Sequence, residues 1–387
     1  MAAIVTEYRH NSHADVIVSR LLQGHTLDGQ GEFPKLKLAS LYTDQVPRND
    51  TSRRLAAEHG FRVSETVADA LTLGTGRLAV EGVLLIAEHG EYPKSQTGQT
   101  VYPKRRLFEE IVKVFRASGR VVPVFCDKHL ADNWKDANWI DTTARELEIP
   151  MMAGSSLPVL WRYPPADVRR GEKLKEVVAV SYHTLDAYGF HALEMVQTLV
   201  ERREGGETGV KSVRTLTGED VWKAGEQGVF DRRLLDEALT RLKERPLPAG
   251  RRLKDLVPNP ELFVIDYRDG LRASVLTLNG AVAEWAVAWR YAGSDETGST
   301  LFWTQEARPF MHFTYLVKGI EQMIHTDRPT WPVERTLLTS GTLDALLISK
   351  HRGGEPLDTP HLGIAYQTDW TWQQPPAPPP GRPISEQ

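Results

Sequence analysis

Cysteine is nearly absent from this sequence, which has one, Cys126, among 387 residues. One thiol excludes an intrachain disulfide and any zinc site built from several thiolates. No apolar run approaches the roughly 20 residues that span a bilayer, so we expect no transmembrane helix and no membrane partner. The formal net charge is only −4, which gives no electrostatic reason to expect nucleic acid. The chain begins directly with a strand-like segment that leaves no room for a signal peptide, and this predicts a cytoplasmic protein.

Glycine is missing from the place where a nucleotide-binding fold needs it most. Apolar residues at 2–5 and again at 16–22 predict a strand, a turn and a helix at the start of the chain. The turn, TEYRHNSH (6–13), lacks the G-x-G-x-x-G pattern that lets the backbone approach a pyrophosphate. Free N–H groups at the helix start can still bind an anion. Two interpretations stay open: a dinucleotide site without its glycines, or a site used for something else.

Strand-like and helix-like segments alternate through the first domain-sized stretch of the chain. The run at 82–88 is apolar throughout, as in a parallel strand buried on both faces. This alternation predicts an α/β fold in which residues 1–160 form a Rossmann-like domain with a doubly wound parallel sheet. Besides 82–88, strands are predicted at 36–43, 121–127 and 150–156, and helices at 50–60, 106–119 and 131–147.

A different pattern follows residues 161–165, WRYPP, which we interpret as a linker. Residues 161–370 are predicted to form an α+β domain with a largely antiparallel sheet, because Asp269-Gly270 joins two strands as a hairpin. The proline-rich tail, 371–387, has too few apolar residues to bury a core, so we expect it to be extended or disordered and its deletion to leave the melting temperature nearly unchanged. Strands are predicted at 176–183, 262–270, 271–280, 283–292 and 299–305, and helices at 191–203, 312–326 and 333–351.

Aromatic side chains alternate along the strand at 283–292. Trp285, Trp289 and Tyr291 fall on one face together with Val287. Such a face is too large to stay in contact with water. It therefore predicts a homodimer or homotetramer in which two such faces meet.

Several stretches, taken in their order, resemble one family of oxidoreductases. They are DKHLADNWKDANWIDTTAREL (127–147), DAYGFHALEMVQTL (186–199), LFVIDYRDGLRASVLTLNG (262–280) and LVKGIEQMIHTDRPTWPVERTLL (316–338). Together they make the chain, over about residues 1–367, similar to the Gfo/Idh/MocA family (glucose–fructose oxidoreductase and inositol dehydrogenase). The chain resembles a divergent member, because the glycine fingerprint is missing and the family's Glu-Lys-Pro has become Asp-Lys-His.

The resemblance implies a nicotinamide cofactor, NAD or NADP, and a sugar or polyol derivative as substrate. It also implies catalytic roles for Lys128, which would orient the substrate hydroxyl, and for His191, which would exchange its proton. Asp186 is the third catalytic candidate, although it precedes His191 by five residues where the family has four.

Polar residues follow most of the predicted strands of the first domain. Ligands of an open α/β sheet bind outside the carboxyl ends of its strands, so these residues are expected to converge. Asp44 ends the second strand, where a dinucleotide fold places the acid that binds ribose hydroxyls. The full set of cofactor-binding candidates is Thr6, Ser12, His13 and Asp44, and the substrate-binding candidates are Asp127, His129 and His183.

A divalent metal is a further hypothesis, because imidazoles and carboxylates gather after two of the strands. These side chains would suit zinc, manganese or iron, but no spacing such as H-E-x-x-H supports such a site. Its ligands would come from Glu88, His89, Asp127, His129 and His191.

Three functions remain open from the sequence. The first is an oxidoreductase-like enzyme that transfers hydride between a sugar or polyol derivative and NAD or NADP, with Lys128 and His191 handling the proton. The second is a non-redox lyase, hydrolase or epimerase on the same scaffold, with or without a metal. The third is a non-catalytic sensor of a small ligand.

Overall fold

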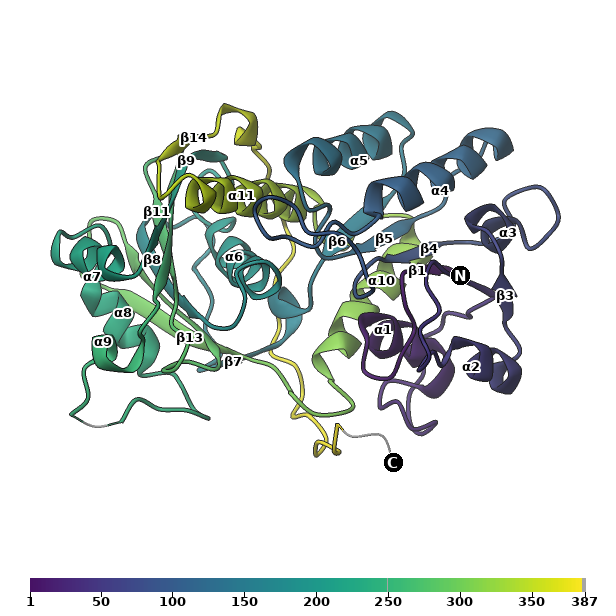
Figure 1. Cartoon of the computed structure of the whole chain (residues 1–387), viewed down its shortest axis with the longest axis horizontal. Coiled ribbons are helices and arrows are strands. Elements are labelled where there is room, and N and C mark those ends of the chain that lie inside the picture. Colours follow the sequence, from purple (N-terminus) through teal and green to yellow (C-terminus); the bar gives the residue numbers. More distant parts are fainter. Residues whose placement is uncertain (249, 385–387) are drawn as a thin grey trace.

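Two β-sheets stand side by side in the protein, which is seen here in a computed structural model that describes residues 1–248 and 250–384 (Figure 1). The first sheet has six parallel strands in the order β3-β2-β1-β4-β5-β6. This is the strand order of a doubly wound dinucleotide fold, and it confirms the predicted α/β class. Its strands are β1 (Ala2–Val5), β2 (Ser40–Thr43), β3 (Arg62–Ser64), β4 (Val83–Ile86), β5 (Val124–Asp127) and β6 (Met151–Gly154).

Apolar residues fill both faces of this first sheet. The four residues of β4 are all buried, as its unbroken apolar run predicts. Two helices end at glycines in the left-handed region, Gly60 with φ 73° and Gly119 with φ 59°, which stop the helices where the sequence suggests. The helices that join these strands are α1 (His13–Gln23), α2 (Ser52–His59), α3 (Val67–Thr72), α4 (Lys104–Ser118) and α5 (Trp134–Glu146).

The second sheet has eight strands in the order β14-β9-β10-β11-β8-β12-β13-β7. Among the described strands, only β11 and β8 pair in parallel, so the largely antiparallel prediction is confirmed. The predicted linker at 161–165 is wrong in part, because Trp161–Tyr163 forms the edge strand β7 on β13. The other strands are β8 (Leu174–Ser181), β9 (Val210–Thr217), β10 (Glu261–Tyr267), β11 (Arg272–Thr277), β12 (Trp285–Tyr291), β13 (Thr297–Trp303) and β14 (Leu357–Asp358).

Helices cover both faces of the second sheet (Figure 1). The aromatic face of β12 packs inside the chain against α6 (Ala187–Val200) and α11 (Glu334–His351), where Trp289 is 2% exposed. The opposite face lies under α7 (Glu219–Glu226) and α8 (Arg232–Leu239), with the short α9 (Leu253–Leu256) beside them. The aromatic face is therefore not in contact with water, and this removes the reason from which an oligomer was predicted.

The two sheets are tied together by the end of the chain. Helix α10 (His312–Thr326) follows the second sheet in sequence but packs beside α1 on the first sheet, with Ile320 and Met323 in the same core as Ile17. The short 3-10 helices η1 (Leu157–Val159) and η2 (Pro360–Leu362) complete the described elements. None of the helices within 1–248 and 250–384 is long and apolar enough to cross a membrane.

The proline-rich tail is extended, as predicted, but it is bound to the rest of the chain. Trp161 Nε1 donates to the carbonyl oxygen of Pro376 in the tail at 2.7 Å. In the reverse direction, Trp372 Nε1 in the tail donates to the carbonyl oxygen of Leu160 at 2.8 Å. Further along, Gln305 Nε2 donates to the carbonyl oxygen of Pro379 at 2.7 Å. The tail thus runs from the second sheet toward α1; residues 385–387 of the predicted tail lie outside the described range.

Candidate active site

A cavity of about 380 Å³ lies between the two sheets, at the carboxyl ends of β1, β4, β5 and β6. Its volume is within the range of small-molecule sites, about 300–1,000 Å³. Buried titratable side chains from both halves of the molecule converge on it. Its lining includes His13, Glu88, His89, Tyr102, Lys128, Ser156, Tyr188, His191, Trp285, Glu306, Phe310, His312 and Phe313.

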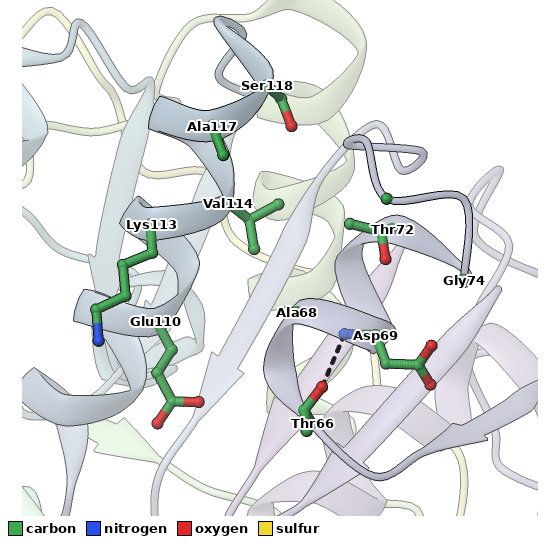
Figure 2. A pocket seen from close by; sticks show the side chains of 11 residues that line it. Thr66, Ala68, Asp69, Thr72, Gly74, Glu110, Lys113, Val114, Ala117 and Ser118 are labelled. Atoms are coloured by element: carbon green, nitrogen blue, oxygen red, sulfur yellow. Dashed lines mark hydrogen bonds between the residues drawn. The ribbon is translucent and has the colours of Figure 1, made fainter.

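A larger hollow, of about 750 Å³, lies between α3 and α4 on the outside of the first sheet (Figure 2). Its polar groups have local partners: Thr66 Oγ1 caps α3 by accepting from the Asp69 N–H at 3.0 Å, and Asp69 pairs with Arg62. Because no buried charged groups converge there, we place the active site in the cavity between the sheets.

Lys128 and Glu88 form a buried ion pair beside the cavity. Lys128 Nζ lies 3.1 Å from Glu88 Oε2, and Lys104 Nζ lies 3.2 Å from Oε1 of the same carboxylate. Burial alone would raise the pKa of Glu88, but the two ammonium groups outweigh it and hold the pKa well below its usual range. Burial likewise opposes the charge of Lys128, yet Glu88 and Asp127 raise its pKa above the ordinary value. Both groups are therefore charged at neutral pH.

Lys104 holds the backbone that carries Lys128. Its Nζ donates to the carbonyl oxygens of Asp127, Lys128 and His129 at 2.6, 2.5 and 2.7 Å. The bond between Lys128 and His129 is a cis peptide. Sequence reasoning missed Lys104, which is one of three successive basic residues at the start of α4. The available signal is that a cation at a helix N-terminus is unfavourable, so a lysine there needs a strong partner.

Histidines surround the ion pair. His13 Nδ1 lies 2.6 Å from Asp127 Oδ2, which joins the start of α1 to the end of β5. The other three imidazoles that line the cavity, His89, His191 and His312, each have a nitrogen without a hydrogen-bond partner among the described residues. Burial lowers the pKa of His89 and of His312 to about 3, and burial with the nearby charge of Lys128 lowers that of His191 well below its usual value. The three rings are therefore neutral at pH 7.

An aromatic wall closes the second-domain side of the cavity. The rings of Tyr188 and Trp285 stack with centroids 5.3 Å apart and an interplanar angle of 22°. The rings of His191 and Trp285 pack edge to face, with their centroids 5.7 Å apart. Trp285 Nε1 is buried without a partner in the described part of the chain. This wall presents aromatic surface to the cavity, while the Trp285 N–H is enclosed within it.

Three predicted site residues point away from this cavity. His129 packs on Phe190 at 4.6 Å, with Nε2 lying 3.2 Å from the Asp186 carbonyl oxygen. Asp186 and His183 line a neighbouring hollow of about 470 Å³, where Asp186 Oδ2 accepts from the Thr100 N–H at 3.1 Å. The structure thus brings Lys128 and His191 together but places His129, Asp186 and His183 in the adjoining region.

The predicted cofactor-binding residues have partners within the chain. Thr6 Oγ1 donates to the carbonyl oxygen of Glu88 at 2.7 Å, and Ser12 caps α1 by accepting from the Asp15 N–H. Asp44 directly follows β2, but its carboxylate accepts from the hydroxyls of Tyr42 and Tyr92 and pairs with Arg106. Of this predicted set, only His13 lines the cavity.

The donors proposed for a metal are not grouped as ligands. Within 1–248 and 250–384, no three His, Cys, Asp or Glu side chains are placed so that they could hold a metal ion. Both oxygens of Glu88 are paired with lysines, and His129 faces α6. The arrangement favours chemistry in which Lys128 supplies the positive charge.

A dinucleotide does not fit the residues at the start of α1. The turn at 6–12 has no glycine, and Tyr8 fills its centre as a fully buried side chain that bonds Ser19 at 2.7 Å. The backbone N–H of Asn11, just before the N-cap Ser12, donates to Asp15 Oδ2 at 2.9 Å. We therefore derive no reaction step through NAD or NADP.

Comparison with solved structures places the fold among dehydrogenases. GenD2 from gentamicin A biosynthesis, solved in complex with NAD, is 15% identical with a TM-score of 0.59, over 92% of this chain and 95% of that one. Apo scyllo-inositol dehydrogenase from Lactobacillus casei is 12% identical with a TM-score of 0.55, over 92% and 97%. Myo-inositol 2-dehydrogenase from Lactobacillus plantarum is 10% identical with a TM-score of 0.54, over 92% and 98%.

Sequence comparison adds nothing to this likeness, since no protein-family model and no curated protein matches the chain. At such low identity the structural likeness shows the fold alone. The protein therefore shares its fold with GenD2 and these inositol dehydrogenases, and this supports its resemblance to the Gfo/Idh/MocA family by fold.

Proposed function

We propose that this protein is an enzyme that moves a proton on a sugar or polyol derivative carrying a carbonyl group, without net oxidation. One observation carries the proposal: the Lys128 ammonium is buried beside the cavity with a single hydrogen-bond partner among the described residues, Glu88. An ammonium has three N–H donors, so two remain for an oxygen of the ligand.

Lys128 acts as an electrostatic stabiliser in this proposal rather than as a base. Its raised pKa keeps it protonated at neutral pH, and a fixed charge in a water-poor site stabilises an oxyanion more strongly than in water. Glu88 keeps that charge in place but is itself shared with Lys104.

His191 is the proposed base. Its lowered pKa leaves it neutral at pH 7, so it can accept a proton from the carbon next to the carbonyl. The electron pair of the broken C–H bond moves to the carbonyl oxygen, which Lys128 stabilises as an enolate. Addition of a solvent proton to the other face of that carbon, with release of the His191 proton to solvent, gives an epimer. Departure of a neighbouring hydroxyl with the His191 proton, as water, gives elimination. Both outcomes balance without an oxidant or reductant.

The cavity wall supports a sugar-like substrate. Trp285 and Tyr188 offer aromatic surface for the C–H face of a sugar, and Lys128, Ser156 and Glu306 line the same cavity with polar groups for its hydroxyls. Such a mixture of apolar surface and polar atoms is what a polyhydroxylated molecule requires.

Hydride transfer with NAD or NADP is the second candidate function. The observation that favours it is the likeness to GenD2, which was solved with NAD. The residues at the start of α1 argue against it, as described above.

Solvent exchange tests the proposal. The protein is incubated in deuterated buffer with D-fructose, D-xylose and, as a probe without a carbonyl, myo-inositol, and deuterium uptake is followed by NMR. We expect uptake into a carbonyl-bearing sugar, reduced at least about a hundredfold in Lys128→Met and in His191→Phe. Lys113→Met, an exposed lysine in the hollow of Figure 2, is the matched control and should keep full activity.

The contrary result is equally clear. If neither sugar takes up deuterium and myo-inositol is oxidised in the presence of NAD or NADP, hydride transfer replaces the proposed reaction. Uptake that survives both Lys128→Met and His191→Phe would remove these residues from the reaction.

A further inference from the structure

We infer that the N-terminus of α1 has been converted from a phosphate-binding end into a clasp between the two halves of the molecule, formed by Asp15 and Arg308. In a dinucleotide fold, this helix end receives the pyrophosphate of the cofactor. Here a carboxylate and a guanidinium of the chain itself take that place. The inference concerns the helix end and not Lys128 or His191, so failure of the sugar exchange alone leaves it standing, whereas nucleotide binding would overturn it.

Asp15 supplies the negative charge that a phosphate would bring. Its Oδ2 accepts from the Asn11 N–H at 2.9 Å and from Arg308 Nη1 at 2.7 Å, and its Oδ1 accepts from the Ser19 hydroxyl at 2.6 Å. Burial would raise the pKa of Asp15, but Arg308 outweighs it and keeps the pKa below the ordinary value. A buried carboxylate, neutralised by Arg308, therefore sits in the first turn of α1 and occupies the Asn11 N–H and the guanidinium donors that an incoming anion would need.

Ser12 and Asn11 make further contacts at this turn. Ser12 Oγ accepts from the Asp15 N–H at 3.3 Å, which uses another donor of the helix end. The Asn11 side chain is held on both sides: its Oδ1 accepts from Arg308 Nη1 at 2.9 Å, and its Nδ2 donates to the carbonyl oxygen of Ile384 at 2.9 Å. The C-terminal tail is thus bound to the same turn.

Arg308 connects this helix end to the wall of the cavity. It lies just before Phe310, His312 and Phe313, all of which line the cavity. Its carbonyl oxygen accepts from the Arg382 N–H at 2.6 Å, so the tail holds the same segment from outside.

A second contact from α1 reinforces this connection. Arg20, which is fully buried, donates from Nη2 to the carbonyl oxygen of Phe310 at 2.8 Å and from Nε to Thr314 Oγ1 at 3.0 Å. In this fold the helix that would bind a cofactor instead fixes the wall of the substrate cavity.

Direct titration of the wild-type protein tests whether the N-terminus of α1 has lost dinucleotide binding. NAD, NADH, NADP and NADPH are each titrated by calorimetry. We expect no saturable binding with a Kd below about 1 mM. Saturable binding of any of them with a Kd below about 1 mM would overturn the inference.

A double-mutant cycle tests the clasp itself. Asp15→Asn, Arg308→Met and the double variant are compared by urea denaturation, with Arg328→Met as the exposed control. Each single variant should lower the unfolding midpoint. The loss of unfolding free energy in the double variant should be clearly smaller than the sum of the losses in the two single variants. Additive losses would show that the two residues do not act as a clasp.

Hydrogen–deuterium exchange tests whether Arg308 holds the segment of the cavity wall that contains Phe310, His312 and Phe313. In Arg308→Met the amides of 305–313 and 376–384 should exchange faster, with those of α4 unchanged; equal rates in wild type and variant would contradict the connection to the cavity. Absence of sugar exchange together with absence of nucleotide binding would overturn the proposed reaction and leave the clasp standing.

Discussion

Lys104 and Lys128 share one buried carboxylate, with their Nζ atoms 3.2 and 3.1 Å from the two oxygens of Glu88. Only Lys128 lines the cavity, whereas Lys104 turns its remaining donors to the backbone carbonyls around Lys128. One lysine is therefore placed to meet the ligand, and the other to position it.

The first prediction concerns Lys104 as a positioning residue. Lys104→Met keeps the aliphatic stem but removes the donors to three carbonyl oxygens, so the Lys128 ammonium should lose its fixed position. We expect deuterium uptake to fall by about tenfold or more through kcat, with a smaller change in KM. Lys113→Met is the control. A loss of stability with an unchanged kcat would show that Lys104 is structural only.

The second prediction is the pH profile of the exchange reaction. His191 must be neutral, and its pKa lies well below 6.5; Lys128 must be charged, and its pKa lies above 10.5. The rate should therefore be flat across neutral pH, fall in acid only below about pH 6.5, and fall in base only above about pH 10.5. Rates at saturating sugar from about pH 5 to 10 measure this. A rate that rises through pH 6–8 would point to a base with an ordinary pKa.

The third prediction is loss of stability in mild acid. Burial lowers the pKa of His129 and of His312 to about 3, against 6.5 in the unfolded chain. Below pH 6.5 the unfolded state binds more protons than the folded one, so stability is lost as the pH falls toward 3. Each histidine contributes at most about 1.4 kcal/mol per pH unit in this window.

Urea denaturation at about pH 7, 6 and 5 measures how steeply the free energy of unfolding changes with pH. Each buried neutral histidine adds to this slope. His312→Gln should reduce it, whereas His59→Gln, which changes an exposed histidine, should not. An identical slope in wild type and His312→Gln would show that His312 is not the source.

Periodicity and turn signals were enough to predict much of the fold from the sequence. The helix predicted at 312–326 has these bounds in α10, and the hairpin at Asp269-Gly270 joins β10 to β11 with Gly270 at φ 90°. The region from β9 to α9 received no prediction, because its helices are short and their packing on the second sheet decides their structure.

Lys128 was predictable from its place after a strand and His191 from the family resemblance. A place after a strand was not sufficient by itself, since the Asp44 carboxylate pairs with Arg106 instead. Lys128 and His191 do face one cavity. His129, the residue next to Lys128, packs instead on Phe190 of α6 and is not among the residues that line the cavity. The clasp could not be read from any local pattern, because Asp15 and Arg308 lie 293 residues apart.

The last prediction reverses an expectation drawn from composition. The tail buries little apolar surface, which suggested that its deletion would be harmless, yet its backbone satisfies donors of Trp161 and Gln305 and its Arg382 binds the carbonyl oxygen of Thr26 at 2.6 Å. Removing residues 374–387 leaves these buried or half-buried groups without partners, at about 1 kcal/mol net for each hydrogen bond. We expect the melting temperature to fall by about 5 °C. Arg382→Gln should lower it less, since the backbone contacts remain. Calorimetry of the two variants measures this, and a truncated protein that melts with the wild type would show that the tail contacts add no stability.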